Sequence, residues 1–388
     1  MAHDPRILIS GASIAGPTLA YWLVRNGFRP TVVERSPALR PGGNGVDIRG
    51  SSVRIAERMG VLPALRERAT DIRELTFVDA ADRRVAGMST RIFNADGDIE
   101  IMRGDLAQVL YEATADDVEF AFGDSIAAIT QRPDAVEVTF DSGKQAEFDL
   151  VIGADGLHSR TRNLAVTPEA DALHHLGVYF ATARVDAALG RPHAVTLYNT
   201  PGKVAGVYRS GAHDGATAFF AFREARVLDV DHRDENAQKA LLSAYFDDRA
   251  WQVPALLEQA TADDGFYFDA VSQVRLPAWS SGRVALVGDA GYCATLLSGA
   301  GAALAIEGAH LLATELAAAG GDHRIAFHRY ERTLRPTVLR AQRSVRASSS
   351  MLIPATGGHI WLRNQLTRLM VLQTLASRVY RPVAVRAA

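Results

Sequence analysis

The chain has 388 residues, 48% of them hydrophobic and 22% charged, and its formal net charge is -2. This is the composition of a globular protein of two or three domains, since a domain typically has about 150 residues. The small net charge gives no reason to expect a nucleic-acid partner. No run of about 18 uncharged apolar residues predicts a membrane span. The single cysteine, Cys293, cannot form an internal disulfide, and no leader pattern precedes the first strand, so we expect a cytoplasmic protein.

The first 34 residues predict a β-α-β unit. The apolar, β-branched run Arg6–Ser10 is typical of a buried parallel strand. Apolar residues at helical spacing follow in Ala15–Asn26, and Gly27 is a suitable C-terminal cap. Thr31–Glu34 is a second strand. This order is the start of a doubly wound, Rossmann-type sheet.

The next elements alternate between helix and strand. They are the helix Met102–Glu112 and the strands Val118–Phe122, Val136–Phe140 and Leu150–Ile152. Between Leu176 and Arg223 the pattern changes to β-branched and aromatic runs separated by turn residues, which predicts an antiparallel sheet in a second domain. Its expected strands are Val195–Tyr198, Val204–Tyr208 and Ala216–Phe222. The helix Glu235–Asp248, the strand Val284–Val287 and the helix Gly301–Leu316 complete this part of the chain.

The C-terminal residues carry an excess of positive charge. From Gly321 to the end there are twelve arginines but only two acidic residues, Asp322 and Glu331. The arginines alternate with apolar residues, so we favour helices packed on an acidic body over a segment that binds nucleic acid or acidic lipid. The expected helices are Ile325–Ser348 and Ile360–Val379, with a loop at 354–358 between them. The apolar face of the second, with Leu362, Leu366, Leu369, Met370 and Leu375, is also typical of an interfacial membrane helix.

These elements predict an α/β fold in which two domains alternate along the chain. The Rossmann-type domain is expected at residues 1–72, 95–170 and 275–320. An antiparallel-sheet domain is expected at 73–94 and 171–274, and a C-terminal helical segment at 321–388.

The turn after the first strand has the pattern of a dinucleotide-binding loop. Gly11-Ala12-Ser13-Ile14-Ala15-Gly16 differs from G-x-G-x-x-G only in Ser13, which is small enough to admit a phosphate. The helix that begins at Ala15 would direct its positive end at the pyrophosphate. Glu34, at the end of the second strand, is placed to accept hydrogen bonds from a ribose.

Two later motifs also follow strands. Asp155-Gly156 comes after Leu150–Gly153, with Ser159 and Arg162 close behind. Gly288-Asp289 comes after Val284–Val287 and is followed by Ser298-Gly299-Ala300-Gly301-Ala302, which opens a helix. Asp289 could accept a hydrogen bond from a ribityl hydroxyl, and the helix N-terminus near Gly301–Ala303 offers N–H groups to an anion.

With these three motifs in this order, the chain resembles the class A FAD-dependent aromatic monooxygenases of the p-hydroxybenzoate hydroxylase fold, which include tetracycline-modifying and polyketide-tailoring hydroxylases. The resemblance covers about residues 6–320 and implies FAD as the cofactor. It also matches Arg103 to the family's arginine beside the ribityl chain, and residues 40–47 to a loop near the flavin. The implied cofactor residues are Gly11, Ser13, Ile14, Ala15, Gly16, Glu34, Arg35, Arg40, Gly43, Asp47, Arg103, Asp155, Asp289, Gly299, Gly301, Ala302 and Ala303.

The chain departs from the family pattern after the Gly-Asp motif. Gly291-Tyr292 stands where Ala-His is usual, Thr295-Leu296 stands where a Pro-Pro pair is usual, and Ala303 stands where Asn is common. Backbone amides would still serve the flavin, so the departures concern the pocket wall beside the ring.

The resemblance implies a reaction in which NAD(P)H reduces FAD, O2 adds at flavin C4a, and the hydroperoxide hydroxylates an aromatic, polycyclic phenolic molecule. Only one dinucleotide fingerprint is present, so NAD(P)H is expected to bind transiently. We assign no catalytic side chain and no metal ligand. Candidates for the substrate wall are Tyr198, Tyr208, Phe220, Phe222 and Arg184, although aromatic residues on strands are more often core.

Other functions stay open. Baeyer–Villiger oxidation, epoxidation and halogenation use the same cofactor, but the W-x-W-x-I-P motif of halogenases is absent from the sequence, where all four tryptophans are isolated. A flavin-binding protein without turnover is an alternative of another class. The expected partners are an aromatic small molecule and O2, with no nucleic acid and no membrane, and the protein is expected to be a monomer or a homodimer.

Overall fold

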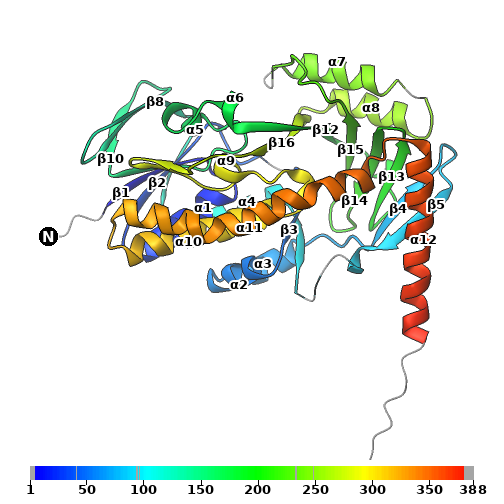
Figure 1. Cartoon of the computed structure of the whole chain (residues 1–388), viewed down its shortest axis with the longest axis horizontal. Helices are drawn as coiled ribbons and strands as arrows, with labels where there is room; N and C mark the ends of the chain where they lie inside the picture. The colour runs from blue at the N-terminus through cyan, green and yellow to red at the C-terminus, as the bar shows by residue number, and fades with distance from the viewer. Residues whose placement is uncertain are drawn as a thin grey trace, which may run out of the picture. The chain divides into compact units, whose positions relative to one another are not determined.

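The computed structural model describes residues 5–40, 42–92, 95, 97–231, 234–247 and 249–379 (Figure 1). The side chains of residues 91, 346–348 and 370–379 lie outside that description, as do Pro41 in the expected flavin loop and Asp248 at the expected end of a helix. The chain divides into two compact units. Unit 1 comprises Met1–Thr70, Asp96–Leu176 and Ala270–Ser348, and unit 2 comprises Asp71–Ala95, Gly177–Asp269 and the chain from Ser349.

A six-stranded sheet in the order β17-β18-β11-β1-β2-β7 forms the centre of unit 1. All neighbouring strands from β18 to β7 are parallel, and only β17 is antiparallel. The parallel strands are continuous apolar runs because both faces of the sheet are covered; Ile7, Leu8 and Ile9 of β1 are fully buried. The strands are β1 (Arg6–Ser10), β2 (Arg29–Glu34), β7 (Glu119–Phe122), β11 (Leu150–Gly153), β17 (Ser280–Ser281) and β18 (Val284–Leu286).

This strand order explains how distant motifs meet. β1 lies between β2 and β11, and β11 pairs with β18 through Val151 and Val284. The carboxyl ends of parallel strands lie at one edge of a sheet, which is where ligands bind in doubly wound folds. The loops after β1, β11 and β18 are the three motif loops, so the fold brings them to the same edge.

Helices and two small sheets complete unit 1. The helices are α1 (Ala15–Arg25), α2 (Ser51–Arg58), α3 (Leu62–Glu67), α4 (Arg103–Glu112), α5 (Arg160–Ala165), α6 (Glu169–Ala172), α9 (Asp289–Tyr292), α10 (Gly301–Ala318) and α11 (His323–Leu352), with the 3-10 turn Leu296–Ser298. The small sheets are β3 (Gly45–Ile48) with β6 (Ile99–Met102), and β10 (Gln145–Phe148) with β9 (Val136–Phe140) and β8 (Ile126–Gln131).

Unit 2 is built on a seven-stranded sheet in the order β16-β12-β15-β14-β13-β4-β5. Its central strands are antiparallel, as expected, but β13 pairs with β4 in parallel, so the sheet is mixed. The strands are β4 (Glu74–Val78), β5 (Arg84–Ser89), β12 (Leu173–Val185), β13 (Ala194–Thr200), β14 (Lys203–Arg209), β15 (Ala216–Arg223) and β16 (Tyr267–Val274). The helices are α7 (Glu235–Tyr245), α8 (Val253–Ala262) and α12 (Gly357–Val379), with the 3-10 turns Thr90–Ile92 and Ala187–Leu189.

The α/β fold class is confirmed, and the differences from expectation lie at element ends. Helix α11 begins two residues earlier and ends four residues later than the expected Ile325–Ser348, and Pro336 lies inside it as expected. Helix α12 begins at Gly357, inside the expected loop. The residues expected to form a C-terminal segment are shared between the two units. Within the part of the chain that the structure describes, no helix is long and apolar enough to cross a membrane.

Candidate FAD site

The turn between β1 and α1 leaves no room for side chains at two of its glycines. Gly11 has a φ of 109°, and a Cβ built on it would lie 2.5 Å from the Ala154 carbonyl oxygen. A Cβ on Gly16 would overlap the carbonyl oxygen of Gly11. Helix α1 has no side-chain cap at its N-terminus. The turn is therefore a close approach of backbone to backbone that ends in unpaired helix N–H groups, as a phosphate loop requires.

Glu34 is anchored to this turn. One carboxylate oxygen accepts the Ala12 N–H at 2.9 Å, and the other accepts the Ser36 N–H at 2.8 Å. Arg40 donates from Nε to the Ser36 hydroxyl at 3.2 Å, and both Arg40 and Arg35 are exposed. The carboxylate that the sequence assigned to a ribose is thus held at the fingerprint loop by backbone amides.

Asp155 of the Asp-Gly motif organises its own loop. Its carboxylate accepts hydrogen bonds from the Ser159 hydroxyl at 2.6 Å and from both the amide and the hydroxyl of Thr161 at 2.9 Å. Ser159 in turn caps α5 by accepting the Arg162 N–H. The structure therefore gives Asp155 a role in shaping the loop after β11.

Arg162 joins this loop to the Gly-Asp motif. The side chain is fully buried and donates from Nη1 to the Ala290 carbonyl at 3.0 Å and from Nη2 to the Leu157 carbonyl at 2.8 Å. Burial lowers the pKa of the guanidinium, although Glu169 at 3.5 Å favours its charged form. The sequence around Arg162 does not indicate this contact, because the partner, Ala290, is 128 residues away.

Gly288 lies between the first turn of α1 and the second turn of α10. Its φ is 66°, and a Cβ on it would lie 3.2 Å from the Ala15 Cβ of α1 and 3.7 Å from the Ala305 Cβ of α10. Neither helix has a side-chain cap at its N-terminus. Gly301, Ala302 and Ala303 form the first turn of α10. Two positive helix ends thus converge on the residue that precedes Asp289, an arrangement suited to a ligand with two separate electronegative groups.

Asp289 is exposed to solvent, although its surroundings shift the pKa of its carboxyl. Burial raises the pKa of its carboxyl, whereas Arg103 and a hydrogen bond from the Cys293 thiol lower it. The side chain nevertheless retains contact with solvent. Cys293 itself is buried, and this contact gives its thiol a partner.

The remaining expected residues approach one another around α10. A Cβ on Gly43 would lie 3.4 Å from Arg103 Cβ, and one on Gly299 would lie 3.5 Å from Asp47 Oδ2. The Arg103 N–H donates to the Asn44 carbonyl at 3.0 Å, which ties the loop before β3 to α4. Asp47 also pairs with Arg49 at 2.9 Å, a partner that the sequence pattern did not mark.

These features fit FAD. Glycines without space for a Cβ border the fingerprint loop, two uncapped helix N-termini converge, and the Asp289 carboxyl lies beside them, accessible to solvent. The expected FAD contacts from the fingerprint to Ala303 all belong to unit 1. Among the described residues, no three His, Cys, Asp or Glu side chains are grouped as metal ligands.

The five residues expected to contact the substrate do not share one face of the unit 2 sheet. Tyr198 and Phe220 are both opposite Ala205, and Phe222 is opposite Lys203, so all three lie on one face. Tyr208 is opposite Val195 and Thr217, and Thr217 is opposite Arg184, so these lie on the other face.

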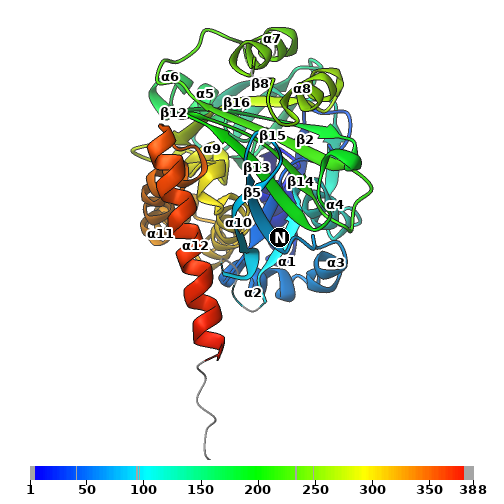
Figure 2. The ribbon, with the colours of Figure 1, turned by 90° about the vertical axis from the view of Figure 1, so that its right-hand side faces the viewer.

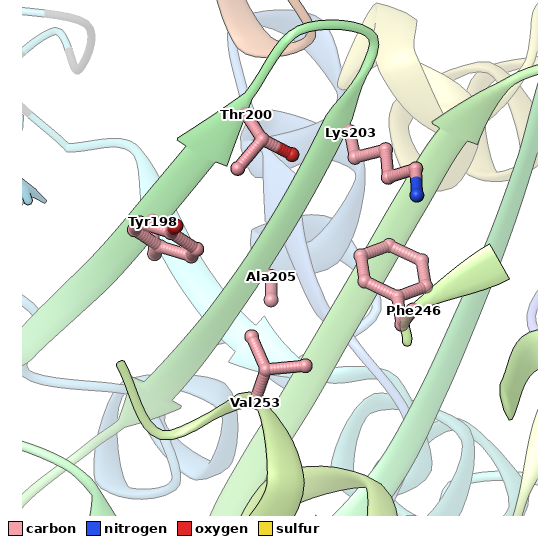
Figure 3. Close-up of a pocket in the computed structure, with 6 residues that line it drawn as sticks. All are labelled: Tyr198, Thr200, Lys203, Ala205, Phe246 and Val253. Atoms are coloured by element: carbon pink, nitrogen blue, oxygen red, sulfur yellow. The ribbon is translucent and has the colours of Figure 1, made fainter. Parts of the chain in front are cut away.

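Helices α7 and α8 cover the face that carries Phe220 and Phe222. Both phenylalanines are fully buried. The Phe222 ring stacks on Tyr245 of α7 at 3.8 Å, and Phe220 meets Phe246 edge-on at 5.1 Å. Figure 3 shows a small hollow on this face, lined by side chains of β13 and β14 and by Phe246 and Val253. Its free volume is about 10 Å³, about the space of one water molecule, so this face has the character of a packed core.

Arg184 and Tyr208 differ in their surroundings. Arg184 is largely exposed; its Nη2 is 3.4 Å from Asp263, which also accepts the Arg184 N–H at 2.8 Å. Tyr208 is half-buried, as is Phe219 on the same face of the neighbouring strand. The sequence could not separate these residues from the core aromatics, because alternation on a strand does not show which face is covered.

Comparison with known proteins agrees with this geometry. Residues 4–342 match a family described as FAD binding domain. An uncharacterized protein of Mycobacterium tuberculosis (strain ATCC 25618 / H37Rv) is 43% identical over 84% of this chain and 88% of its own. A flavin-dependent monooxygenase of Legionella longbeachae serogroup 1 (strain NSW150) is 38% identical over 91% of each chain. The crystal structure of tetracycline destructase Tet(51) superposes with a TM-score of 0.84 at 36% identity, over 95% of this chain and 97% of that one. The chain therefore belongs to the FAD binding domain family and is an FAD-dependent monooxygenase whose partners are a small molecule and O2.

Proposed function

We propose that this monooxygenase hydroxylates a polycyclic phenolic molecule, with NAD(P)H as a transient reductant. The observation that carries the proposal is the convergence of the uncapped α1 and α10 N-termini on Gly288, next to the solvent-accessible Asp289. The similarity to a tetracycline destructase over 95% of the chain supports the substrate class, because tetracyclines are polycyclic phenols.

Each part of the unit 1 site would hold a different part of FAD. The amides at Gly11–Gly16 and the positive end of α1 would bind the pyrophosphate, and Glu34 would accept from the ribose. Asp289 and Arg103 would contact the ribityl chain, and the first turn of α10 would stabilise negative charge on the ring. When bound, FAD supplies the two-electron redox chemistry and the activation of O2. The protein groups bind, orient and exclude water.

The substrate would contact the face of the unit 2 sheet that α7 and α8 leave uncovered. Tyr208 and Phe219 provide two half-buried aromatic rings there, and offset stacking on such rings suits a flat fused-ring molecule. The opposite face is packed, because Phe220 and Phe222 are fully buried under α7.

The test begins with flavin reduction by NADPH and by NADH, followed anaerobically through visible absorbance in the purified FAD-loaded protein. A panel of phenolic polyketides that includes tetracycline is then added with O2, and products are analysed by mass spectrometry. We expect reduction by at least one nicotinamide and a product that gains one oxygen atom. Absence of flavin reduction by either nicotinamide, on any timescale, would refute the reductant. If the enzyme oxidised only non-aromatic molecules, the proposed substrate class would be refuted.

A further inference from the structure

Over residues 357–369, where the structure describes its side chains, helix α12 is apolar on the side that faces solvent. Trp361 is 63% exposed, and Leu362, Leu366 and Leu369 are 48%, 52% and 55% exposed. The three leucines repeat at i, i+4 and i+7, so they form one stripe along the helix. We call these four residues the α12 apolar face. Such grouping of large apolar side chains on a surface marks an interaction site.

The side of α12 that packs on unit 2 is polar. Arg363 and Thr367 are 8% and 3% exposed, and each follows one of the leucines, so each is turned from it by about 100°. Arg363 donates from Nη1 to Asn199 Oδ1 at 3.0 Å and to the Met351 carbonyl at 3.2 Å. Its guanidinium lies 3.6 Å from the centre of the Phe77 ring.

A second basic residue fixes the same orientation. Arg368 donates from Nε to the Val85 carbonyl of β5 at 2.8 Å, and α12 lies along that strand (Figure 2). Because hydrogen bonds hold Arg363 and Arg368 to unit 2, the helix cannot turn its leucines inward without breaking them. The apolar face is thus directed outward by specific contacts.

The charge of this part of the chain limits what the occupant could be. From Gly357 to the C-terminus the sequence has five arginines, one histidine and no Asp or Glu. A second copy docked through α12 would bring two helices without carboxylates together, and a two-fold contact would place like charges opposite each other. An anionic lipid surface offers complementary charge, an apolar layer for leucines and an interface that tryptophan favours.

We propose that the α12 apolar face binds the surface of an anionic membrane, with the helix lying in the interface. The inference does not depend on the flavin chemistry.

The test is flotation of the full-length, FAD-loaded protein with vesicles. We expect the protein to float with vesicles of phosphatidylglycerol and phosphatidylcholine, to bind phosphatidylcholine alone at least about tenfold more weakly, and to lose binding as salt rises. The double variant L362Q/L366Q should bind the anionic vesicles at least about tenfold more weakly. Val227→Gln, which replaces an apolar side chain that is 77% exposed outside α12, is the matched control and should bind like the wild type.

Two further measurements make the outcome decisive. Trp361 emission should shift to the blue on anionic vesicles, because Trp22 and Trp279 are already buried and Trp251 is half-buried and bonded to Asp82. FAD content and thermal stability of the double variant should equal those of the wild type, since both leucines are about half exposed. Absence of vesicle binding, or equal binding to neutral vesicles, would overturn the proposal. A dimer that L362Q/L366Q dissociates, without vesicle binding, would overturn it and assign the face to a second copy.

Discussion

Units 1 and 2 encode their sites in different ways. In unit 1 the site consists largely of backbone: glycines without room for a Cβ, helix N-termini, and carboxylates bonded to amides. In unit 2 the candidate site consists of side chains on one face of a sheet whose other face is core. A site built from backbone can be recognised in the sequence by glycines and aspartates at fixed distances from strands. A site on a sheet face can be recognised only by alternating side chains along a strand, which do not show which face binds. The following predictions test this difference, from the largest expected effect to the smallest.

The covered face of unit 2 should behave as core. Phe222→Ala removes a fully buried ring that stacks on Tyr245, so the free energy of unfolding should fall by about 3–5 kcal/mol. Denaturant titration measures this loss, and steady-state kinetics below the transition should show an unchanged KM. A raised KM with unchanged stability would instead place Phe222 in the substrate wall.

The fingerprint turn of unit 1 should not tolerate a single added carbon. Gly16→Ala forces a Cβ onto the Gly11 carbonyl oxygen, and the FAD dissociation constant should rise at least about 100-fold, which corresponds to about 2.7 kcal/mol. Titration of the apoprotein with FAD, followed by flavin fluorescence, measures this change. The control is Gly357→Ala, where a Cβ meets no atom within 4 Å. Similar FAD affinities in the two variants would contradict the steric argument.

Arg162 should connect two motifs of unit 1. Arg162→Lys cannot reach both the Ala290 and Leu157 carbonyls, so we expect about 2 kcal/mol lower stability and weaker FAD binding. Arg160→Lys is the matched control, because Arg160 pairs with Asp141 on the surface and such pairs contribute about 0–1 kcal/mol. Equal losses in the two variants would show that burial of Arg162 is unimportant.

Substitutions on the face of the unit 2 sheet that α7 and α8 leave uncovered should alter substrate binding more than stability. Tyr208→Leu should raise the KM for the phenolic substrate several-fold, equivalent to about 1 kcal/mol of lost ring stacking. Tyr198→Leu, on the helix-covered face, should leave KM unchanged. The opposite result would assign the substrate to the face under α7 and α8.

The smallest effect should come from Asp289 in the apoprotein. Burial raises the pKa of this carboxyl above its ordinary value, so the folded state binds its proton more tightly than the unfolded state does. Its contribution is therefore most favourable below the ordinary pKa and is lost as pH rises through the raised one. Melting temperatures across acidic to neutral pH should show this decline in the wild type and a flatter profile in Asp289→Asn. Identical profiles in the two proteins would contradict a raised pKa for the Asp289 carboxyl.

The sequence predicted the parts of the fold that local chemistry determines. The β1-α1-β2 unit is recovered within two residues at each end, and β9 is recovered without error. Helix α11 continues through Pro336, as expected, and is longer than predicted at both ends. Strand β4 was missed because its partner β13 is more than 100 positions away, and β5 was missed with it because β4 is its partner. Arg162 likewise gained its partner Ala290 only in the folded chain, whereas Asp47 pairs with Arg49 two positions away.

Because Val151 of β11 pairs with Val284 of β18, the central sheet of unit 1 is completed late in synthesis. A ribosome releases the chain from its N-terminus, so β1, β2 and β11 emerge long before β18 completes their sheet. Most of unit 2 is synthesised in that interval. During this time the edge of β11 that later receives β18 has no partner within its own unit, and an open edge of this kind is a site for wrong pairing. The sheet of unit 2 is thus free to form during synthesis, whereas the central sheet of unit 1 closes only after about three quarters of the chain has emerged.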